Sequence, residues 1–482
     1  MNNKLKEFTR NFSYTLSSNL ITMIVSAMVV FIVPKLIGIE EYGYWQLFLF
    51  YSSYVPFLQL GWTDGIYLRY GGERKDSLNN QLFYSQFILL FGSQLLIAAL
   101  IIMFSKEFIH DYNKAQIIRL TSFYMILVNT RYLFTYILQA TNRFKEFSRI
   151  IIYDRFIYVF MVIIALLLSV KNYKILIYAD LAGKTTSLLL SIYICRDFAL
   201  QNINKFKIYK QETLDNIRAG IKVMFSNTAS MLIIGFIRLG IERTWDVAIF
   251  GKVSLTLSIS NFMMIFINAV GIVMFPMLRR TEENKLPDIY NILSKAYSFF
   301  IFGVLFLYYP LKEILFKWLP EYSDSLVYMA LLFPLSVYEG KMALLVNPYL
   351  KTLRKENLLL KINIAGSLVS IIVSITTSYV IQNLNLAVLS IVIVLGLRCV
   401  LSELILSRIL GINIGLNIII ETILVIIFIV LGWMENSLIS GLVYLLVYGI
   451  FLYINRYGIQ KSVELIKSNI NLEKRGCNPP IE

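Results

Sequence analysis

The amino-acid sequence predicts an all-α polytopic membrane protein with about 14 transmembrane helices. Of its 482 residues, 57% are hydrophobic and only 16% are charged, and long apolar stretches recur from one end of the chain to the other. Soluble domains carry about 25% charged residues, whereas about 20 consecutive apolar residues let a helix cross a bilayer. A barrel of strands is disfavoured, because its segments would be shorter and would alternate in polarity.

Fourteen apolar segments are each long enough to cross a hydrocarbon core of about 30 Å as a helix. They are residues 13–34, 44–67, 82–104, 117–139, 150–170, 175–195, 221–240, 248–276, 297–316, 326–350, 359–381, 386–408, 415–433 and 438–455. The first segment lacks a small-residue cleavage site and contains several polar residues. We therefore interpret it as a retained span rather than a cleaved signal.

The loops between these segments alternate between basic and non-basic. If the N-terminus is cytoplasmic, Lys and Arg concentrate in the inside loops and are sparse in the outside loops. Basic loops mark the cytoplasmic side of membrane proteins, so both termini are predicted to be cytoplasmic. We interpret the net charge of +15 as favouring contact with anionic membrane lipids. No nucleic acid is expected as a partner.

A short internal repeat divides the predicted helices into two groups. The sequence Gly-Ile-Glu follows the first span at 38–40 and the seventh span at 240–242. With six spans in each half, the repeat predicts two lobes of the same orientation and a pathway between them near the midplane. The expected domains are an N-terminal lobe (1–200), a basic cytoplasmic linker (201–220), a C-terminal lobe (221–410) and two additional transmembrane helices with a cytoplasmic tail (411–482).

Charged residues inside apolar spans are the first candidates for a functional site. Each costs roughly 2.5 to 3.5 kcal/mol at a helix centre, so Arg131, Lys184, Lys341 and Arg398 should face protein or water. Such cations suit an anionic group, and the alternative for each is a structural ion pair. Lys184 has Asp180 four residues earlier on the same helical face. Arg131 and Lys341 have no such neighbour and are the stronger candidates for substrate contact.

Further candidates are polar residues near the predicted pathway. Asn19 belongs to a polar stripe of the first span, which binds either sugar hydroxyls or neighbouring helices. Asp64 and Arg69 close the second span on the cytoplasmic side, where they form either a gate or an ordinary interfacial pair. The acidic candidates for carrying a coupling proton or sodium ion are Asp64, Asp180, Glu339 and Glu403.

Three segments resemble a known family of transporters. They are VPKLIGIEEYGYW at 33–45, LGWTDGI at 60–66 and GIERTWDVAIFG at 240–251. They are similar to the polysaccharide-transport family, the Wzx-type O-antigen flippases of the superfamily that includes the multidrug and toxin extrusion transporters. The resemblance covers the whole chain by the number and order of spans. Relatives commonly have an acidic-basic pair at the position where this chain has Arg243. Here Glu242 instead precedes Arg243 directly, and in this the chain departs from the family pattern.

The resemblance implies two six-helix lobes around a central cavity and two extra C-terminal helices. It implies a flippase that moves an undecaprenyl-pyrophosphate-linked oligosaccharide across the bacterial inner membrane by alternating access. A polysaccharide polymerase and a chain-length regulator are the protein partners that it implies. The alternatives are a multidrug-type cation antiporter of the same superfamily and a membrane polysaccharide polymerase or glycosyltransferase. The last is disfavoured, because no large external loop or metal-carboxylate cluster is visible.

No cofactor or metal is expected. The segment GKTT at 183–186 resembles the end of a phosphate-binding loop, but Tyr178 stands where that loop requires glycine. The three cysteines, Cys195, Cys399 and Cys477, lie far apart and indicate neither a disulfide nor a metal site. The protein is therefore expected to be a transporter rather than an enzyme.

Overall fold

The computed structural model describes residues 2–168, 170–279, 281–434 and 437–474. In these residues all regular secondary structure is helical, and 12 helical segments are long and apolar enough to cross a membrane. The predicted class, an all-α multi-pass membrane protein, is thus confirmed. The predicted count of 14 spans is not confirmed, and the cytoplasmic location of both termini stays a prediction. Cys195 and Cys399 are buried free thiols, and Cys477 lies outside the described residues.

The chain divides into two compact units. Unit 1 comprises residues 1–228 and 245–254, and unit 2 comprises residues 229–244 and 255–482. Helices α9 (Lys210–Thr244) and α10 (Val247–Arg279) each contribute residues to both units. The domain boundaries predicted from the sequence, at 200, 220 and 410, stay a prediction.

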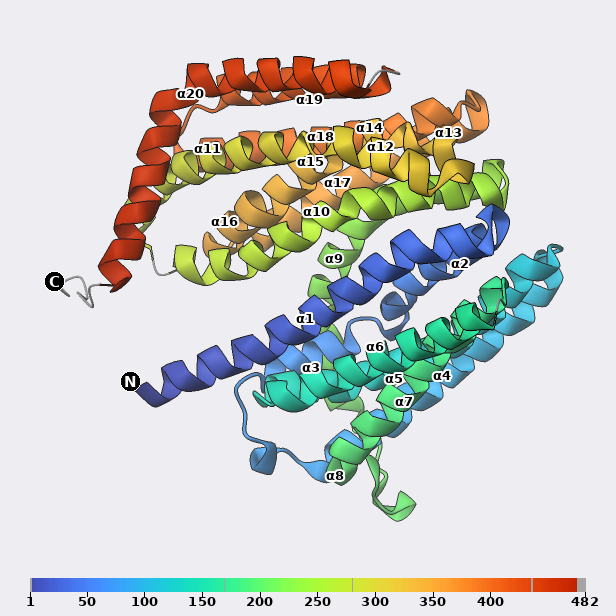
Figure 1. Cartoon of the computed structure of the whole chain (residues 1–482). Coiled ribbons are helices and arrows are strands. Elements are labelled where there is room, and N and C mark those ends of the chain that lie inside the picture. The colour runs from blue at the N-terminus through green and yellow to red at the C-terminus, as the bar shows by residue number, and fades with distance from the viewer. Residues whose placement is uncertain (1, 169, 280, 435–436, 475–482) are drawn as a thin grey trace. The chain divides into compact units, whose positions relative to one another are not determined.

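Unit 1 is built mainly from long helices that pack in pairs. Its elements besides α9 and α10 are α1 (Asn2–Ile37), α2 (Ile39–Ser53), η1 (Val55–Gln59), α3 (Trp62–Tyr70), η2 (Lys75–Ser77), α4 (Asn80–Phe108), α5 (Tyr112–Ala140), α6 (Phe144–Leu167), α7 (Tyr173–Ile194), α8 (Arg196–Ala199) and η3 (Ile203–Lys205). Helix α6 packs on α7 and on α1, and α4 packs along α5 (Figure 1). The middle of α5 is thereby enclosed by other helices.

The predicted span 44–67 is broken into α2, η1 and α3. Pro56 lies in the first turn of η1, and Leu60 and Gly61 adopt left-handed conformations with φ of 54° and 74°. A side chain at Gly61 would collide with the backbone of Gly220 on α9. The break frees backbone carbonyls, which inside a membrane must be bonded within the protein. Asn129 Nδ2 donates to the carbonyl oxygen of Val55 at 3.1 Å.

The predicted span 117–139 forms most of helix α5, yet α5 is not among the 12 apolar segments. Asn129, Thr130 and Arg131 occupy consecutive buried positions in the middle of the helix. These side chains lower its mean hydropathy, although its length is sufficient to cross a bilayer. The two differences from the predicted count therefore have distinct causes, a backbone break in one segment and polar residues in the other.

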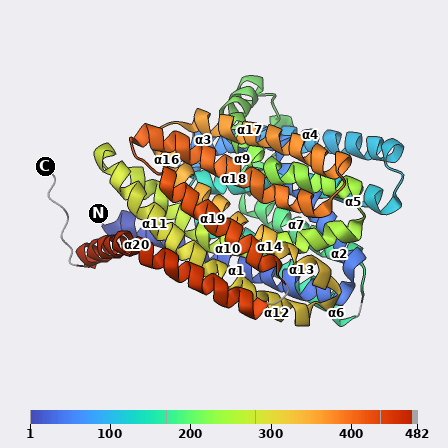
Figure 2. The same ribbon diagram turned by 90° about the horizontal axis from the view of Figure 1, so that it is seen from above.

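Unit 2 contains shorter and more interrupted helices. Besides its parts of α9 and α10 it comprises η4 (Glu283–Lys285), α11 (Leu286–Leu305), α12 (Tyr308–Trp318), η5 (Pro320–Tyr322), α13 (Ser323–Leu326), α14 (Tyr328–Leu332), α15 (Leu335–Lys341), η6 (Met342–Val346), α16 (Asn347–Thr352), α17 (Glu356–Ser374), η7 (Ile375–Val380), α18 (Leu384–Leu410), α19 (Gly415–Trp433) and α20 (Ser437–Lys474). Segments η6 and η7 are π-helical. Helix α20 lies along α19 and also packs on α11 (Figure 2).

Candidate functional site

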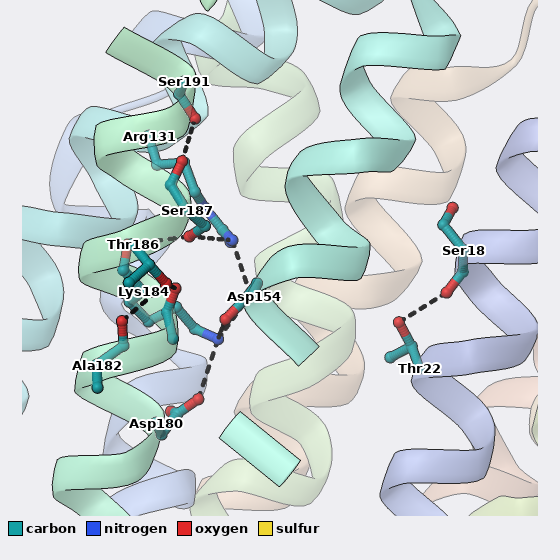
Figure 3. A network of polar contacts seen from close by, with 11 residues as sticks. Ser18, Thr22, Arg131, Asp154, Asp180, Ala182, Lys184, Thr186, Ser187 and Ser191 are labelled. Atoms are coloured by element: carbon teal, nitrogen blue, oxygen red, sulfur yellow. Dashed lines mark hydrogen bonds and ion pairs between the residues drawn. The ribbon is translucent and has the colours of Figure 1, made fainter. Parts of the chain in front are cut away.

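A buried network of charged side chains joins α5, α6 and α7 in unit 1. Arg131 Nη1 lies 2.8 Å from Asp154 Oδ2, and Lys184 Nζ lies 2.9 Å from the same oxygen. Lys184 also pairs with Asp180 at 3.0 Å (Figure 3). None of the four residues is more than 9% exposed. Asp154 is the common partner that holds cations from two different helices.

Hydroxyl and aromatic groups surround this network. Ser187 Oγ accepts a hydrogen bond from Arg131 Nη1 at 3.2 Å (Figure 3). The Lys184 ammonium lies 5.9 Å from the centre of the Tyr124 ring. A cation over an aromatic face is attracted by the negative face of the ring. The site therefore supports positive charge in more ways than through its carboxylates alone.

The network of unit 1 carries more positive than negative charge. Arg155 follows Asp154 on α6 and interacts electrostatically with both Asp154 and Asp180. Three cationic groups therefore share two carboxylates, which leaves a surplus of one positive charge. The Nε atoms of Arg131 and Arg155 are buried and have no hydrogen-bond partner among the described residues. Buried donors of this kind are costly, so they are suited to receive an oxygen ligand.

A second buried network lies in unit 2, where Lys341 at the end of α15 meets two carboxylates. Lys341 Nζ lies 2.9 Å from Glu403 Oε2 on α18 and 2.5 Å from Glu421 Oε2 on α19. Tyr290 donates to the other oxygen of Glu403 at 2.6 Å, and Ser298 donates to the other oxygen of Glu421 at 2.5 Å. This trio, Lys341, Glu403 and Glu421, has one ammonium group for two carboxylates and therefore a surplus of one negative charge.

A separate pair lies beside the trio. Arg398 on α18 contacts Glu339 on α15 at 2.8 Å, and the Arg398 side chain is almost fully buried. This pair is balanced in charge, although the Nε atom of Arg398 is buried without a hydrogen-bond partner in the described part of the chain. Glu339 and Lys341 are thus near neighbours in sequence, but they bind different partners because they lie on different faces of α15.

The remaining sequence-predicted residues lie apart from these networks. Asn19 is exposed on α1, and Asp64 on α3 is hydrogen-bonded to Tyr136. Arg69 pairs with Glu212 on α9, its two terminal nitrogens lying 2.5 and 3.1 Å from the two carboxylate oxygens. The interfacial pair considered between Asp64 and Arg69 is therefore replaced by a pair between Arg69 and Glu212. The functional roles predicted for Asn19, Asp64 and Arg69 stay predictions.

Sequence reasoning missed two of the five carboxylates that bind the predicted cations, whereas Asp180, Glu339 and Glu403 were among the candidates. Asp154 and Glu421 were not among the candidates, although each is an acidic residue inside a predicted apolar span. Their partners are on other helices, so spacing along one helix could not reveal the contacts. The signal that was available is the high cost of a carboxylate in an apolar segment. A list of intramembrane acids made beside the list of cations would have found both residues.

No protein-family model and no curated protein matches the chain. Among solved structures, the lipid II flippase MurJ in an inward closed conformation aligns with a TM-score of 0.65 and 14% identity, over 93% of this chain and 99% of that one. An inward-facing multidrug resistance MATE transporter of the MOP superfamily aligns with a TM-score of 0.63 and 11% identity, over 82% and 98%. An outward-facing MATE transporter aligns with a TM-score of 0.53 and 14% identity, over 83% and 95%.

These similarities define the class of the fold. The chain is a multi-pass membrane protein with the fold shared by MATE transporters and the lipid II flippase. Because the identities are low, the similarity concerns the fold alone. The substrate must be argued from the residues of this chain.

Proposed function

We propose that this protein is a flippase that moves undecaprenyl-pyrophosphate-linked oligosaccharide repeat units, of an O-antigen or a similar surface polysaccharide, across the bacterial inner membrane by alternating access. The observation that carries the proposal is the surplus of positive charge in unit 1, around the buried Arg131 and Lys184 and the half-buried Arg155. The fold shared with the lipid II flippase supports a lipid-linked substrate. A membrane protein holds intramembrane cations chiefly where they serve a pathway or a ligand.

A pyrophosphate group matches the donors of this network. Arginine presents several N–H groups in a planar fork and binds two oxygens at once, whereas lysine acts as a point charge. The unpartnered Nε atoms of Arg131 and Arg155 are donors beyond those already bonded to Asp154. An arriving pyrophosphate competes with Asp154 and Asp180 for the cations, so that the network exchanges one set of anionic partners for another.

The other predicted residues enter the proposal in supporting roles. Lys341 and Arg398 are further candidates for contact with the pyrophosphate, and Asn19 for contact with a sugar hydroxyl. Asp64, Arg69, Asp180, Glu339 and Glu403 are candidates for gating or ion coupling. The proposal contains no covalent step, and it includes a polysaccharide polymerase and a chain-length regulator as later users of the transported glycan.

The test is complementation of a strain in which the gene is deleted. We expect Arg131→Ala, at wild-type membrane levels, to fail to restore surface polysaccharide while lipid-linked repeat units accumulate inside. The matched control is Lys75→Ala, which removes an exposed cation of the same unit and should restore the polysaccharide fully. If the deletion itself leaves surface polysaccharide intact, the proposed function is wrong.

A double variant separates binding from folding. Arg131→Ala combined with Asp154→Asn removes the cation and neutralises its partner, so fewer charges remain buried without compensation. If Arg131 served only to neutralise Asp154, this variant would restore flipping. If Arg131 binds substrate, the variant reaches wild-type membrane levels and still fails to restore the polysaccharide.

Extrusion of a cationic drug is the second candidate function. The observation that favours it is the surplus negative charge of the trio in unit 2, which suits an organic cation. Similarity of fold to MATE transporters also supports it. The deletion strain distinguishes the two functions, because a loss of drug resistance with intact surface polysaccharide would favour extrusion.

A further inference from the structure

A small cavity lined by both polar and apolar side chains lies in unit 2 between α11, α19 and α20. Its volume is about 20 Å³. The polar side chains that line it are Ser294, Lys295, Ser298, Asn417, Glu421 and Asn455. Lys295, Asn417 and Asn455 are half-buried, so the cavity extends from the surface of these helices to the carboxylate of Glu421.

This cavity has the size and the chemistry to hold water. A cavity must offer roughly 10 to 15 Å³ to hold one water, together with two to four polar partners. Hydroxyl, amide and carboxylate groups supply such partners here. Between transmembrane helices a polar cavity is tolerated only where water or protein satisfies its polar groups. Water therefore has access to one side of the trio.

The two carboxylates of the trio differ in their access to the cavity. The side chain of Glu421 is 12% exposed, whereas those of Lys341 and Glu403 are 3% exposed. The second oxygen of each carboxylate accepts a hydrogen bond, from the fully buried Tyr290 in Glu403 and from Ser298 in Glu421, and only Ser298 lines the cavity. Glu421 is thus the member of the trio that lines the cavity, while one of its oxygens holds Lys341.

Every helix packed against Glu421 contributes to its electrostatic surroundings. Helix α18 contributes Glu403 and Cys399, and α11 contributes Tyr290, Lys295 and Tyr297. Lys341 and the Glu339–Arg398 pair are the further charged groups, and α20 contributes the neutral Asn455. Two carboxylates contact one ammonium directly, which leaves one negative charge in a medium of low dielectric constant. One added proton makes the trio neutral.

A metal cation fits the same position less well than a proton. The Lys341 ammonium already occupies the position between the two carboxylates. Among the described residues no group of three or more His, Cys, Asp or Glu side chains is arranged to hold a metal ion. Sodium would have to take the position of the ammonium between both carboxylates, whereas a proton on Glu421 loosens only the contact between Glu421 and Lys341 and leaves the Lys341–Glu403 pair in place.

We propose that Glu421 binds and releases a proton through this cavity, and that protonation frees Lys341 to pair with Glu403 alone. The proton comes from bulk water through the cavity water, and Glu421 changes from a carboxylate to a neutral carboxylic acid. The bond broken is the ion pair between α15 and α19. The role of this protonation as the energy-coupling step of transport rests on the proposed function. Proton binding by Glu421 does not rest on it.

Labelling with dicyclohexylcarbodiimide tests the site directly, because this reagent modifies protonated carboxyl groups in apolar surroundings. The purified full chain in detergent is labelled across a range from about pH 5 to about pH 9, and modified residues are identified by mass spectrometry. We expect modification at Glu421 that decreases as the pH rises. Labelling of Glu403 instead, or labelling of Glu421 that is independent of pH, would overturn the proposal.

Matched variants test the route and the ion. Ser294→Leu fills the cavity and should reduce labelling of Glu421 at least several-fold, whereas Thr422→Leu, beside Glu421 but outside the cavity lining, should not change it. Equal labelling in both variants contradicts access through the cavity. Protection of Glu421 by sodium at constant pH contradicts a proton site and indicates a sodium site.

The coupling role has its own measurement. Glu421→Gln mimics the protonated side chain and should remove the pH dependence of flipping in proteoliposomes. If no lipid-linked substrate is flipped by wild type while Glu421 is labelled as expected, the proposed function fails and proton binding stands. If wild type flips the substrate and the Glu421→Gln variant retains the wild-type pH dependence, the coupling role is refuted.

Discussion

The buried networks of the two units contain similar residue types but opposite charge balances. In unit 1, Arg131, Arg155 and Lys184 share Asp154 and Asp180, and the surplus is positive. In unit 2, Lys341 alone serves two glutamates, and the surplus is negative. Two of the three cations of unit 1 are guanidinium groups, which stay charged because arginine does not lose its proton in proteins. A surplus carboxylate is neutralised by a single proton.

This difference suggests a division of roles. The network of unit 1 reaches neutrality when it acquires an anion, which fits an anionic substrate group. The trio of unit 2 has a water-sized cavity at Glu421 and reaches neutrality by protonation. The following predictions address this comparison.

The largest expected effect is that of Asp154→Leu. This change leaves Arg131 without its carboxylate partner and removes one partner of Lys184. Breaking a buried ion pair from one side costs about 3 to 5 kcal/mol, and here the Arg131 guanidinium cannot lose its charge. We expect severe loss of folded protein, measured by thermal unfolding in detergent. Stability equal to wild type would show that the network is already solvated.

A smaller effect is expected for Lys341→Met in unit 2. It leaves Glu403 and Glu421 without their ammonium, but Glu421 is neutralised when it takes up a proton through the cavity. The loss should be about 2 to 3 kcal/mol at neutral pH and smaller in acid, because a protonated carboxyl needs no counterion. Thermal unfolding as a function of pH measures this effect. Equal destabilisation at all pH values would mean that protonation does not relieve the trio of unit 2, and the two networks would then not differ in this respect.

Arg69→Ala should cost less than either buried change. Arg69 and Glu212 form a forked pair at the end of α3, but the Arg69 side chain is about a third exposed at 32%. Partly exposed pairs contribute about 1 kcal/mol or less. Thermal unfolding with Arg69→Lys as the control should show a small loss for both variants, larger for alanine. A loss of stability as large as that of Asp154→Leu would mean that the burial of an ion pair does not determine how much stability its removal costs.

The smallest effect is expected for Lys75→Ala. Lys75 hydrogen-bonds to Asp197, and this contact lowers the pKa of the Asp197 carboxyl. A lowered pKa means that the contribution is present above the unfolded value of about 4 and is lost as pH falls further. Both side chains are exposed, so we expect a loss of a few tenths of a kcal/mol, vanishing in acid and in high salt. A pH-independent loss would indicate packing rather than charge.

The comparison also shows what the sequence predicts and what it does not. Apolar length predicts most of the spans, and the spacing of Asp180 and Lys184 indicates a pair that the structure contains at 3.0 Å. The break at Gly61 was missed, because the apolar residues continue through it while the backbone turns. Asp154 and Glu421 were missed, because contacts between helices leave no trace in the spacing along one helix.

The dependence of Arg131 on neighbours that follow it in the chain has a consequence for biosynthesis. Its partners Asp154 and Ser187 lie on α6 and α7, 23 and 56 residues later. When α5 leaves the insertion machinery these helices have not yet been made, so Arg131 lacks every protein partner in this network. An arginine facing lipid is costly, so α5 should stay at the insertion machinery until α6 and α7 arrive. Helices α5 to α7 are therefore expected to enter the bilayer as one unit.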